Sequence, residues 1–391
     1  MFQVFIGIGL HAVGACCASL CYVPQKKTTG WSWQTYWLAQ ALVCWLLMPI
    51  IGAAISIPHL FSVLSEAPKS AMLSSFLLGM AYGIGGTAFG IAIRYVGFSL
   101  TYAIAVGISC VFGTLIPPMV HGTLGTILSG NGSNLVIIGI AIGALGIALC
   151  GLAGRSKEKN MVKTSITTFS LAKGLPLCFL AGILSAVYGF ALDQGAPIAA
   201  IAAKYGAGNF QGNVIFLFAN TGAFLSTLIY CVYLHKKKNT FKEYFNIPVR
   251  TGLKRGGGVI GVASQHNLKL IAATEQDENP VSTLVDAQLP EAEPIQRNVG
   301  YYFLMSALTG VLWYSQFFFY LIAHIHMGNF KFTSWAIHMI MLVLFSTVAG
   351  LTMKEWSNCN KKTINLLALA LGVLVIAVLI LTYGNYLGGR G

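Results

Sequence analysis

Ten stretches of about twenty apolar residues run through this chain, and they constrain its fold more than any other feature. An α-helix of about twenty apolar residues matches the thickness of the hydrocarbon core of a bilayer, where every backbone group must be hydrogen-bonded within the protein. The sequence therefore predicts an all-α polytopic membrane protein with ten transmembrane helices. The stretches cover residues 3–24, 35–57, 71–94, 100–120, 134–154, 174–203, 211–234, 300–323, 333–353 and 363–387.

The composition agrees with this interpretation. Hydrophobic residues make up 56% of the chain and charged residues only 9%, whereas charged residues alone are about a quarter of a typical soluble protein. The mean hydropathy is +0.72. No basic residue precedes the first stretch, so we expect it to be a retained helix and not a removable signal.

Lys and Arg are distributed unequally among the connecting loops. Twenty of the 24 basic residues lie in the loops that follow the odd-numbered stretches, and these loops are all on the same side of the membrane. Because basic loops stay on the cytoplasmic side, the pattern predicts that both termini face outward. The net charge of +13 is then a signal of topology, and we expect no nucleic-acid partner.

A short pattern recurs in the two halves of the chain. Gly79 and Tyr82, followed by Gly97, match Gly310 and Trp313, followed by Gly328, with a constant offset of 231 residues. Gly14 and Gly182 pair less specifically, at an offset of 168. The two offsets differ by nearly the length of the polar segment 235–298. Removing that segment brings the two halves into register, as expected for the internal repeats of a transporter.

The repeat predicts the domain organisation. Residues 1–154 form a first five-helix repeat, residues 155–173 a cytoplasmic linker, and residues 174–391 a second five-helix repeat with a cytoplasmic insertion at 235–298. Since five is an odd number, the second repeat is inverted relative to the first. Inverted repeats place a substrate site near the middle of the bilayer and permit alternating access.

The eighth stretch carries polar and aromatic side chains along one face. At 100° per residue this face holds Trp313, Gln316, Phe317, Tyr320 and His324. Such groups serve helix packing, because their polar tips find partners on a neighbouring helix. They also suit a sugar, whose C–H faces stack on rings and whose hydroxyls need fixed donors and acceptors. Spacing alone leaves both interpretations open.

Asp193 is the acidic residue that falls inside an apolar stretch. A carboxylate near the middle of a bilayer costs about 2.5–3.5 kcal/mol on insertion scales, so its presence indicates a function. The alternative is that the sixth helix is shifted and Asp193 lies near the outer surface. Pro197 cannot donate a hydrogen bond to the Asp193 carbonyl, which predicts an irregular helix at this point.

Two histidines are further candidates for carrying a proton. The ordinary pKa of histidine, about 6.5, allows a modest change of surroundings to add or remove a proton. His11 is predicted near the middle of its helix, and His338 about two turns inside the end of its helix. The alternative for each is a buried histidine that only satisfies a hydrogen bond.

No enzyme or channel pattern competes with transport. The sequence contains no metalloprotease motif, no paired carboxylates within the stretches and no nucleophile elbow. It also lacks a repeated filter motif or a charged ring. We expect no metal site, and the chemistry that remains is the transport of a small molecule.

With these residues identified, the chain resembles the L-rhamnose/proton symporter family, a ten-helix branch of the drug/metabolite transporter superfamily. The resemblance covers nearly the whole chain except the 235–298 insertion. The segments that carry it are "YVPQKKTTGWSW" (22–33), "IRYVG" (93–97), "WYSQFFFY" (313–320), "SWAIHM" (334–339) and "KEW" (354–356).

The resemblance implies proton-driven uptake of a deoxyhexose such as L-rhamnose across a bacterial inner membrane, with both termini periplasmic. Sugar, protons and membrane lipids are then the partners, no cofactor is involved, and the oligomeric state is open. It favours sugar binding by the face of the eighth helix, with Trp313, Gln316 and Tyr320 holding the sugar. Tyr82 would face them from the first repeat, and Tyr314 is a further candidate. His338 or His11 would take part in proton coupling, with Asp193 as a third candidate.

The chain departs from the family pattern at three points. Gly86, Thr87 and Ala88 stand where polar amide residues are expected, the insertion is longer, and Asp193 stands where the family accepts a neutral amide. A different sugar therefore remains open as the substrate. Two other functions also remain: a facilitator or exporter of another small metabolite, and a membrane sugar sensor that signals through its insertion.

Overall fold

In the residues that it describes, the computed structural model confirms an all-helical protein with ten helices long and apolar enough to cross a membrane. It describes residues 2–25, 27–28, 30–96, 98–162, 171–245, 298–357 and 359–388. All ten predicted stretches correspond to these helices. Most of the 235–298 insertion and the repeat residue Gly97 lie outside the described residues.

The helices follow the chain as two sets of five. The first set is α1 (Phe2–Leu20) with the short α2 (Tyr22–Gln25); α3 (Trp33–Ala41), η1 (Leu42–Leu47) and α4 (Met48–Ser56) in one span; α6 (Lys69–Val96); α7 (Phe98–Val120); and α9 (Ser133–Val162). The second set is α10 (Leu171–Gln194) with α11 (Ala196–Lys204); α12 (Asn213–Lys238); α14 (Val299–Ile325); α15 (Ser334–Thr352); and α16 (Lys361–Gly388). Short connecting helices are α5 (Leu60–Glu66), α8 (Leu124–Leu128), η2 (Gly208–Phe210), η3 (Phe241–Tyr244) and η4 (Gly328–Thr333).

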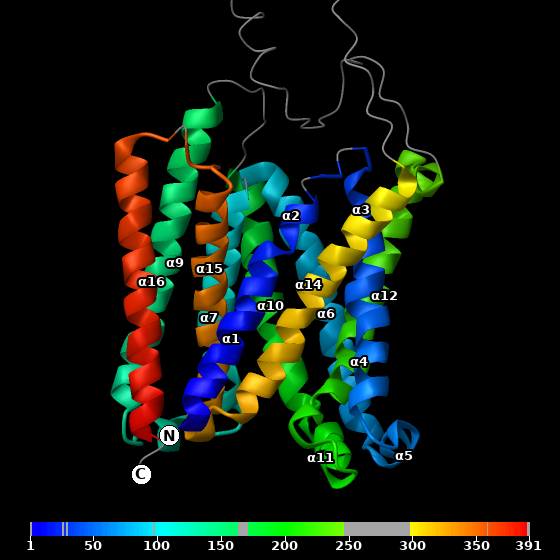
Figure 1. The fold of residues 1–391 in the computed structure, drawn as a ribbon, viewed down its shortest axis with the longest axis vertical. Coiled ribbons are helices and arrows are strands. Elements are labelled where there is room, and N and C mark those ends of the chain that lie inside the picture. Colours follow the sequence, from blue (N-terminus) through cyan, green and yellow to red (C-terminus); the bar gives the residue numbers. More distant parts are fainter. Residues whose placement is uncertain are drawn as a thin grey trace, which may run out of the picture.

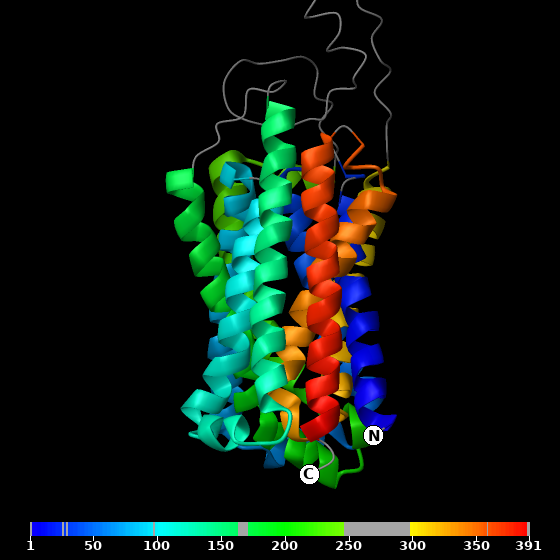
Figure 2. The same cartoon turned by 90° about the vertical axis from the view of Figure 1, so that its left-hand side faces the viewer.

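The spans form an upright bundle with both chain ends at the same end (Figure 1). We call this the terminal end, and the other, where α9 and α12 finish, the loop end. Helices α9 and α16 pack side by side at one edge of the bundle (Figure 2). Since α9 continues to Val162, the beginning of the predicted linker is helical and not a loop.

The packing of one set of helices repeats in the other. Helix α6 packs against α10 and α12, and α14 packs against α1 and the α3–η1 span. Helix α7 contacts α10 and α9, just as α15 contacts α1 and α16. If each helix of the first set is exchanged for the helix at the same position in the second set, every one of these contacts is replaced by another contact of the same group.

The repeated glycines lie at equivalent contacts. A Cβ atom on Gly79 would collide with the Ala219 backbone of α12. One on Gly310 would come within 2.8 Å of the Gln40 carbonyl oxygen of α3. Small residues let helices approach closely where no side chain intervenes. Because Tyr82 and Trp313 each follow such a glycine by three residues, the two aromatic residues lie at equivalent positions along α6 and α14.

The sixth span breaks where the sequence predicts an irregularity. Helix α10 ends at Gln194 and α11 begins at Ala196, with Pro197 in its first turn. Proline is tolerated there because the first helical N–H groups have no partner within the helix. The break is confirmed, and it places Asp193 at the end of a helix.

The second span contains a π-helical segment, Leu42–Leu47. One extra residue per turn shifts the register of the helix, and such segments often occur at functional sites. Here Cys44 and Trp45 are buried while Leu42 and Leu47 are exposed. The shifted register therefore directs Trp45 toward the interior of the bundle.

Candidate functional site

A central cavity lies between helices of both sets, in the half of the bundle toward the loop end. Its volume is about 100 Å³, whereas a single water molecule needs about 10–15 Å³ when volume is counted in the same way. The space therefore suits a molecule of several heavy atoms. Its lining residues are Ala18, Cys21, Trp37, Tyr82, Gly85, Gly86, Phe89, Tyr102, Ala105, Val106, Ala181, Ser185, Trp313, Gln316, Met339 and Leu342.

One wall of the cavity is aromatic. The ring centroids of Trp37 and Trp313 lie 5.8 Å apart with the rings nearly perpendicular. Trp45 lies behind them, 5.8 Å from Trp313 and 6.0 Å from Tyr82. Edge-to-face contacts hold such rings in fixed orientations. The wall therefore presents rigid ring surfaces to whatever occupies the cavity.

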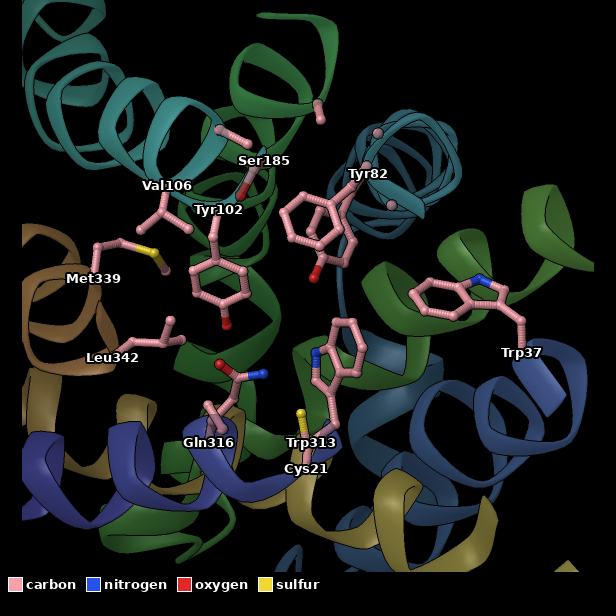
Figure 3. A pocket seen from close by; sticks show the side chains of 16 residues that line it. Cys21, Trp37, Tyr82, Tyr102, Val106, Ser185, Trp313, Gln316, Met339 and Leu342 are labelled. Atoms are coloured by element: carbon pink, nitrogen blue, oxygen red, sulfur yellow. The ribbon is translucent and has the colours of Figure 1, made fainter. Parts of the chain in front are cut away.

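Polar groups converge on the same space. In Figure 3 the hydroxyl of Tyr102 and the amide of Gln316 point toward each other, and the hydroxyl of Tyr82 points toward Trp313. Ser185 also lines the cavity, and its hydroxyl is held by Ser109 at 2.9 Å. A few fixed polar groups in an apolar pocket are the usual arrangement for orienting a small ligand.

Two histidines lie beside the cavity, toward the terminal end. The imidazole centroids of His11 and His338 are 5.9 Å apart, and Tyr320 packs against both, at 5.3 and 5.6 Å. His338 Nε2 donates to Gln316 Oε1 at 3.3 Å. Both ring nitrogens of His11 and Nδ1 of His338 are buried without a hydrogen-bond partner among the described residues. The pair is thus linked to the cavity through one amide.

A tryptophan closes the bundle on the terminal side of these residues. Trp335 Nε1 donates to the backbone oxygen of Ser109 at 3.0 Å and lies 3.1 Å from its hydroxyl. Its ring packs against Tyr320 and Tyr188. Gly113 faces the indole, and a Cβ atom there would lie 2.5 Å from Trp335 Nε1. Helices α7 and α15 therefore meet closely at this level.

The structure brings together three of the five predicted substrate-binding residues. Trp313, Gln316 and Tyr82 line the cavity. Tyr320 lies in the adjacent histidine cluster instead. Tyr314 lies on another face of α14, against Gly52 and Phe216. The predicted aromatic and polar face of this helix is buried except for the partly exposed His324, whereas Val311 is 37% exposed.

Asp193 lies apart from the histidine pair. Its carboxylate is 2.6 Å from His121 Nε2, and the two side chains are 36% and 47% exposed. The sequence left two positions open for Asp193, one near the middle of the bilayer and one near the surface. In the structure the side chain lies near the surface.

Sequence reasoning missed several lining residues. Trp37, Tyr102 and Ser185 lie on helices where the sequence shows no single polar face, so periodicity did not mark them. Trp33 and Trp37, four residues apart, are stacked at 5.1 Å, and this spacing was a signal that could have been used. Gly86 lines the cavity, which agrees with the expectation that its lack of a side chain affects the site.

Comparison with known proteins identifies the family. The profile of the L-rhamnose-proton symport protein matches residues 2–249 and 278–386. The chain belongs to this family. It is 30% identical to the L-rhamnose-proton symporter of Shigella dysenteriae serotype 1 (strain Sd197) over 383 residues, which are 97% of this chain and 98% of the relative. The L-rhamnose-proton symporters of Escherichia coli (strain 55989 / EAEC) and Shigella boydii serotype 18 (strain CDC 3083-94 / BS512) are also 30% identical, with the same coverage.

Proposed function

We propose that this protein takes up L-rhamnose or a closely related deoxyhexose together with a proton. Membership of the L-rhamnose-proton symport protein family over nearly the whole chain supports this function, and the family consists of transporters and not enzymes. The observation that carries the proposal within the structure is the hydrogen bond between Gln316 and His338. It links the central cavity, of about 100 Å³, to a pair of buried histidines.

The cavity has the chemistry that a deoxyhexose requires. Trp313 and Trp37 offer ring surfaces to the C–H faces of the sugar, and Gln316 and Tyr102 can exchange hydrogen bonds with its hydroxyls. The methyl group of a 6-deoxy sugar needs an apolar place. Ala105, Val106 and Ala181 provide one in the lining of the cavity. Tyr320 then supports the histidines and contributes to binding through them.

Gln316 gives the proton a way to affect the sugar. When His338 carries a proton on Nε2 it donates to the Gln316 carbonyl, and the amide NH₂ is left to face the cavity. When Nε2 is unprotonated it can only accept, so the amide must turn. The presence or absence of a proton on His338 Nε2, which loading of the ring or a change of tautomer can alter, therefore selects which group of Gln316 meets the sugar. His11, 5.9 Å away, favours a single positive charge on the pair because like charges repel.

Asp193 is the third candidate for the proton route. At the terminal end its carboxylate lies 2.6 Å from His121 Nε2. This position suits the collection of protons from the outer solution rather than the coupling step. Protons would then reach the buried pair past Tyr320.

Alternating access follows from the correspondence of the two sets of helices. We propose that residues 1–154 and 174–391 are inverted repeats that rock about the cavity, a mechanism that the matching contacts of α6 and α14 support.

We also propose that the protein lies in the bacterial inner membrane with both termini periplasmic. The excess of Lys and Arg at the loop end supports this orientation.

The experiment that tests this function measures sugar-induced alkalinisation. Energy-depleted cells expressing the protein are suspended in weak buffer, and L-rhamnose, L-lyxose, L-fucose or D-mannose is added. We expect L-rhamnose to make the medium alkaline, and a His338→Ala variant to bind the sugar without a pH change. Entry of the sugar down its concentration gradient without a pH change in the wild type would indicate a facilitator. Binding without entry would indicate a sensor.

A further inference from the structure

A second cavity lies between the central cavity and the loop end. It offers about 70 Å³ of space to solvent and is lined by Tyr102, Ala103, Cys150, Lys157, Val343, Ser346, Thr347, Gly350, Glu355 and Trp356. Tyr102 lines both cavities. One side chain therefore forms a wall that the two spaces share.

A tight turn after α15 places two of the lining residues. Lys354 adopts the left-handed conformation, with φ of 58°, and the N–H of Glu355 donates to the Gly350 carbonyl at 3.0 Å. This is the hydrogen bond by which a left-handed residue ends a helix and turns the chain back. The turn returns Glu355 and Trp356 to the end of α15, over the cavity.

A lysine on the facing helix completes a charged site. Lys157 Nζ lies 3.6 Å from Glu355 Oε2 and 4.6 Å from the centroid of the Trp356 ring. The two charged side chains are only 12% and 30% exposed. Partly buried charges cost free energy unless they are paired. Here each charge has the other as its partner, so the pair places one carboxylate and one ammonium group in the wall of the cavity next to the central one.

The lining has the chemistry of a sugar site. An indole ring offers a stacking surface, a carboxylate accepts hydrogen bonds from hydroxyls, and an ammonium group donates to them. Ser346 and Thr347 add two hydroxyl groups on α15. A monosaccharide leaving the central cavity past Tyr102 would meet all of these groups at once.

We propose that the second cavity is a release subsite for the transported monosaccharide, on its path from the central cavity to the loop end. The inference rests on the proposed function. The sugar would separate Lys157 from Glu355, exchanging their ion pair for hydrogen bonds to its hydroxyls. Re-formation of the pair after release would close the path.

Native cysteines report on this subsite without any change to the chain. Cys150 lines the second cavity, and Cys178 lies buried on α10 outside both cavities. Membranes containing the protein are treated with N-ethylmaleimide with and without L-rhamnose, and alkylation of each cysteine is followed by peptide mass spectrometry. We expect the sugar to slow alkylation of Cys150 at least threefold and to leave Cys178 unchanged.

Variants of the two cavities separate direct occupancy of the second cavity from a conformational effect on Cys150. In Trp313→Ala and in Gln316→Ala, which weaken the central site, Cys150 should still be protected at high L-rhamnose concentration. In Glu355→Gln the protection should be lost and the uptake rate reduced about tenfold, while sugar binding at the central site is unchanged. The charge-exchanged pair Lys157→Glu with Glu355→Lys should recover part of the uptake.

The outcomes distinguish this inference from the proposed function. If the wild type shows sugar-induced alkalinisation but L-rhamnose never protects Cys150, the release subsite is refuted and symport stands. Protection that disappears in both central-site variants would also refute it, because it would reflect a conformational change. Absence of alkalinisation with every sugar would refute symport itself, by a separate measurement.

Discussion

Nε2 of His338 donates a hydrogen bond of 3.3 Å to the side-chain carbonyl of Gln316, on a neighbouring helix. Both side chains are buried, at 2% and 7% exposure. Gln316 is also part of the cavity wall. A single amide therefore touches both the proposed sugar and the proposed proton carrier.

Replacing Gln316 should impair sugar binding and coupling together. We expect Gln316→Leu to raise the L-rhamnose KM at least tenfold, and to reduce the number of protons taken up per sugar. Losing one hydrogen bond to a buried group costs about 1–3 kcal/mol. Ser315→Ala is the matched control, because Ser315 donates only to the Val311 carbonyl of its own helix. Unchanged coupling in Gln316→Leu would contradict the proposed role.

Gly14 gives a second test of the histidine position. A Cβ atom on Gly14 would lie 3.3 Å from Cε1 of His338 and 3.2 Å from the backbone carbonyl oxygen of Gln316. The Gly14→Ala variant should displace the imidazole slightly and lower the rate of sugar-induced alkalinisation several-fold. Gly9→Ala, on the same helix, meets nothing within 4 Å and should leave the rate unchanged. Equal rates in the two variants would argue against a tightly positioned His338.

Asp193 should matter less than His338. An exposed pair such as Asp193 with His121 contributes only about 0–1 kcal/mol to stability. Water can also replace an exposed carboxylate as the source of protons. We expect Asp193→Asn to slow proton-coupled uptake no more than about threefold, while retaining the alkalinisation that His338→Asn abolishes. Initial rates of L-rhamnose uptake and of pH change, measured on the same cells, decide this. Complete uncoupling in Asp193→Asn would move the coupling step to the terminal end.

Gly79 and Gly310 should respond alike to substitution. Each faces the backbone of another helix at an equivalent contact, and overpacking costs about 1–3 kcal/mol. Gly79→Ala and Gly310→Ala should both lower the thermal stability of the detergent-solubilised protein. Gly372→Ala on α16, where nothing lies within 4 Å, should not. If only one of the two variants is destabilised, the equivalence of the two sets of helices is weaker than the contacts indicate.

Two adjacent glycines in α6 allow the cavity wall to be tested. A Cβ atom on Gly86 would meet Trp45 at 3.6 Å, an ordinary contact, whereas one on Gly85 would come within 2.7 Å of Leu184. Gly86→Ala should therefore fold normally and change the preference among L-rhamnose, L-fucose and L-lyxose. Gly85→Ala should reduce the amount of folded protein. Sugar preference is read from competition for uptake, and an unchanged preference in Gly86→Ala would place the sugar away from this wall.

The ten membrane helices could be predicted from the sequence, because such helices require long apolar stretches and no tertiary contact alters that requirement. The break before Pro197 followed from the missing N–H of proline. Helix ends were less predictable, since α9 continues to Val162 through charged residues that extend beyond the apolar stretch. Which helices are neighbours depends on packing between residues distant in sequence.

The site was predictable where one helix face carried it. Trp313 and Gln316 lie on the amphipathic face of α14, and Tyr82 followed from the repeat. Tyr314 belongs to the same sequence segment but is turned about 100° from Trp313 on an ideal helix, and it packs elsewhere. Trp45 enters the interior through the π-helical segment, and a change of helical register is invisible to a fixed period.

The aromatic wall also gives this protein an optical property. Four of its seven tryptophans, Trp33, Trp37, Trp45 and Trp313, form a continuous series of rings whose neighbouring centroids lie 5.1 to 6.4 Å apart. At such separations, excitation of one indole passes readily to the next. A sugar that moves Trp313 would alter the emission of the whole series, so occupancy of the cavity can be followed by intrinsic fluorescence without a label.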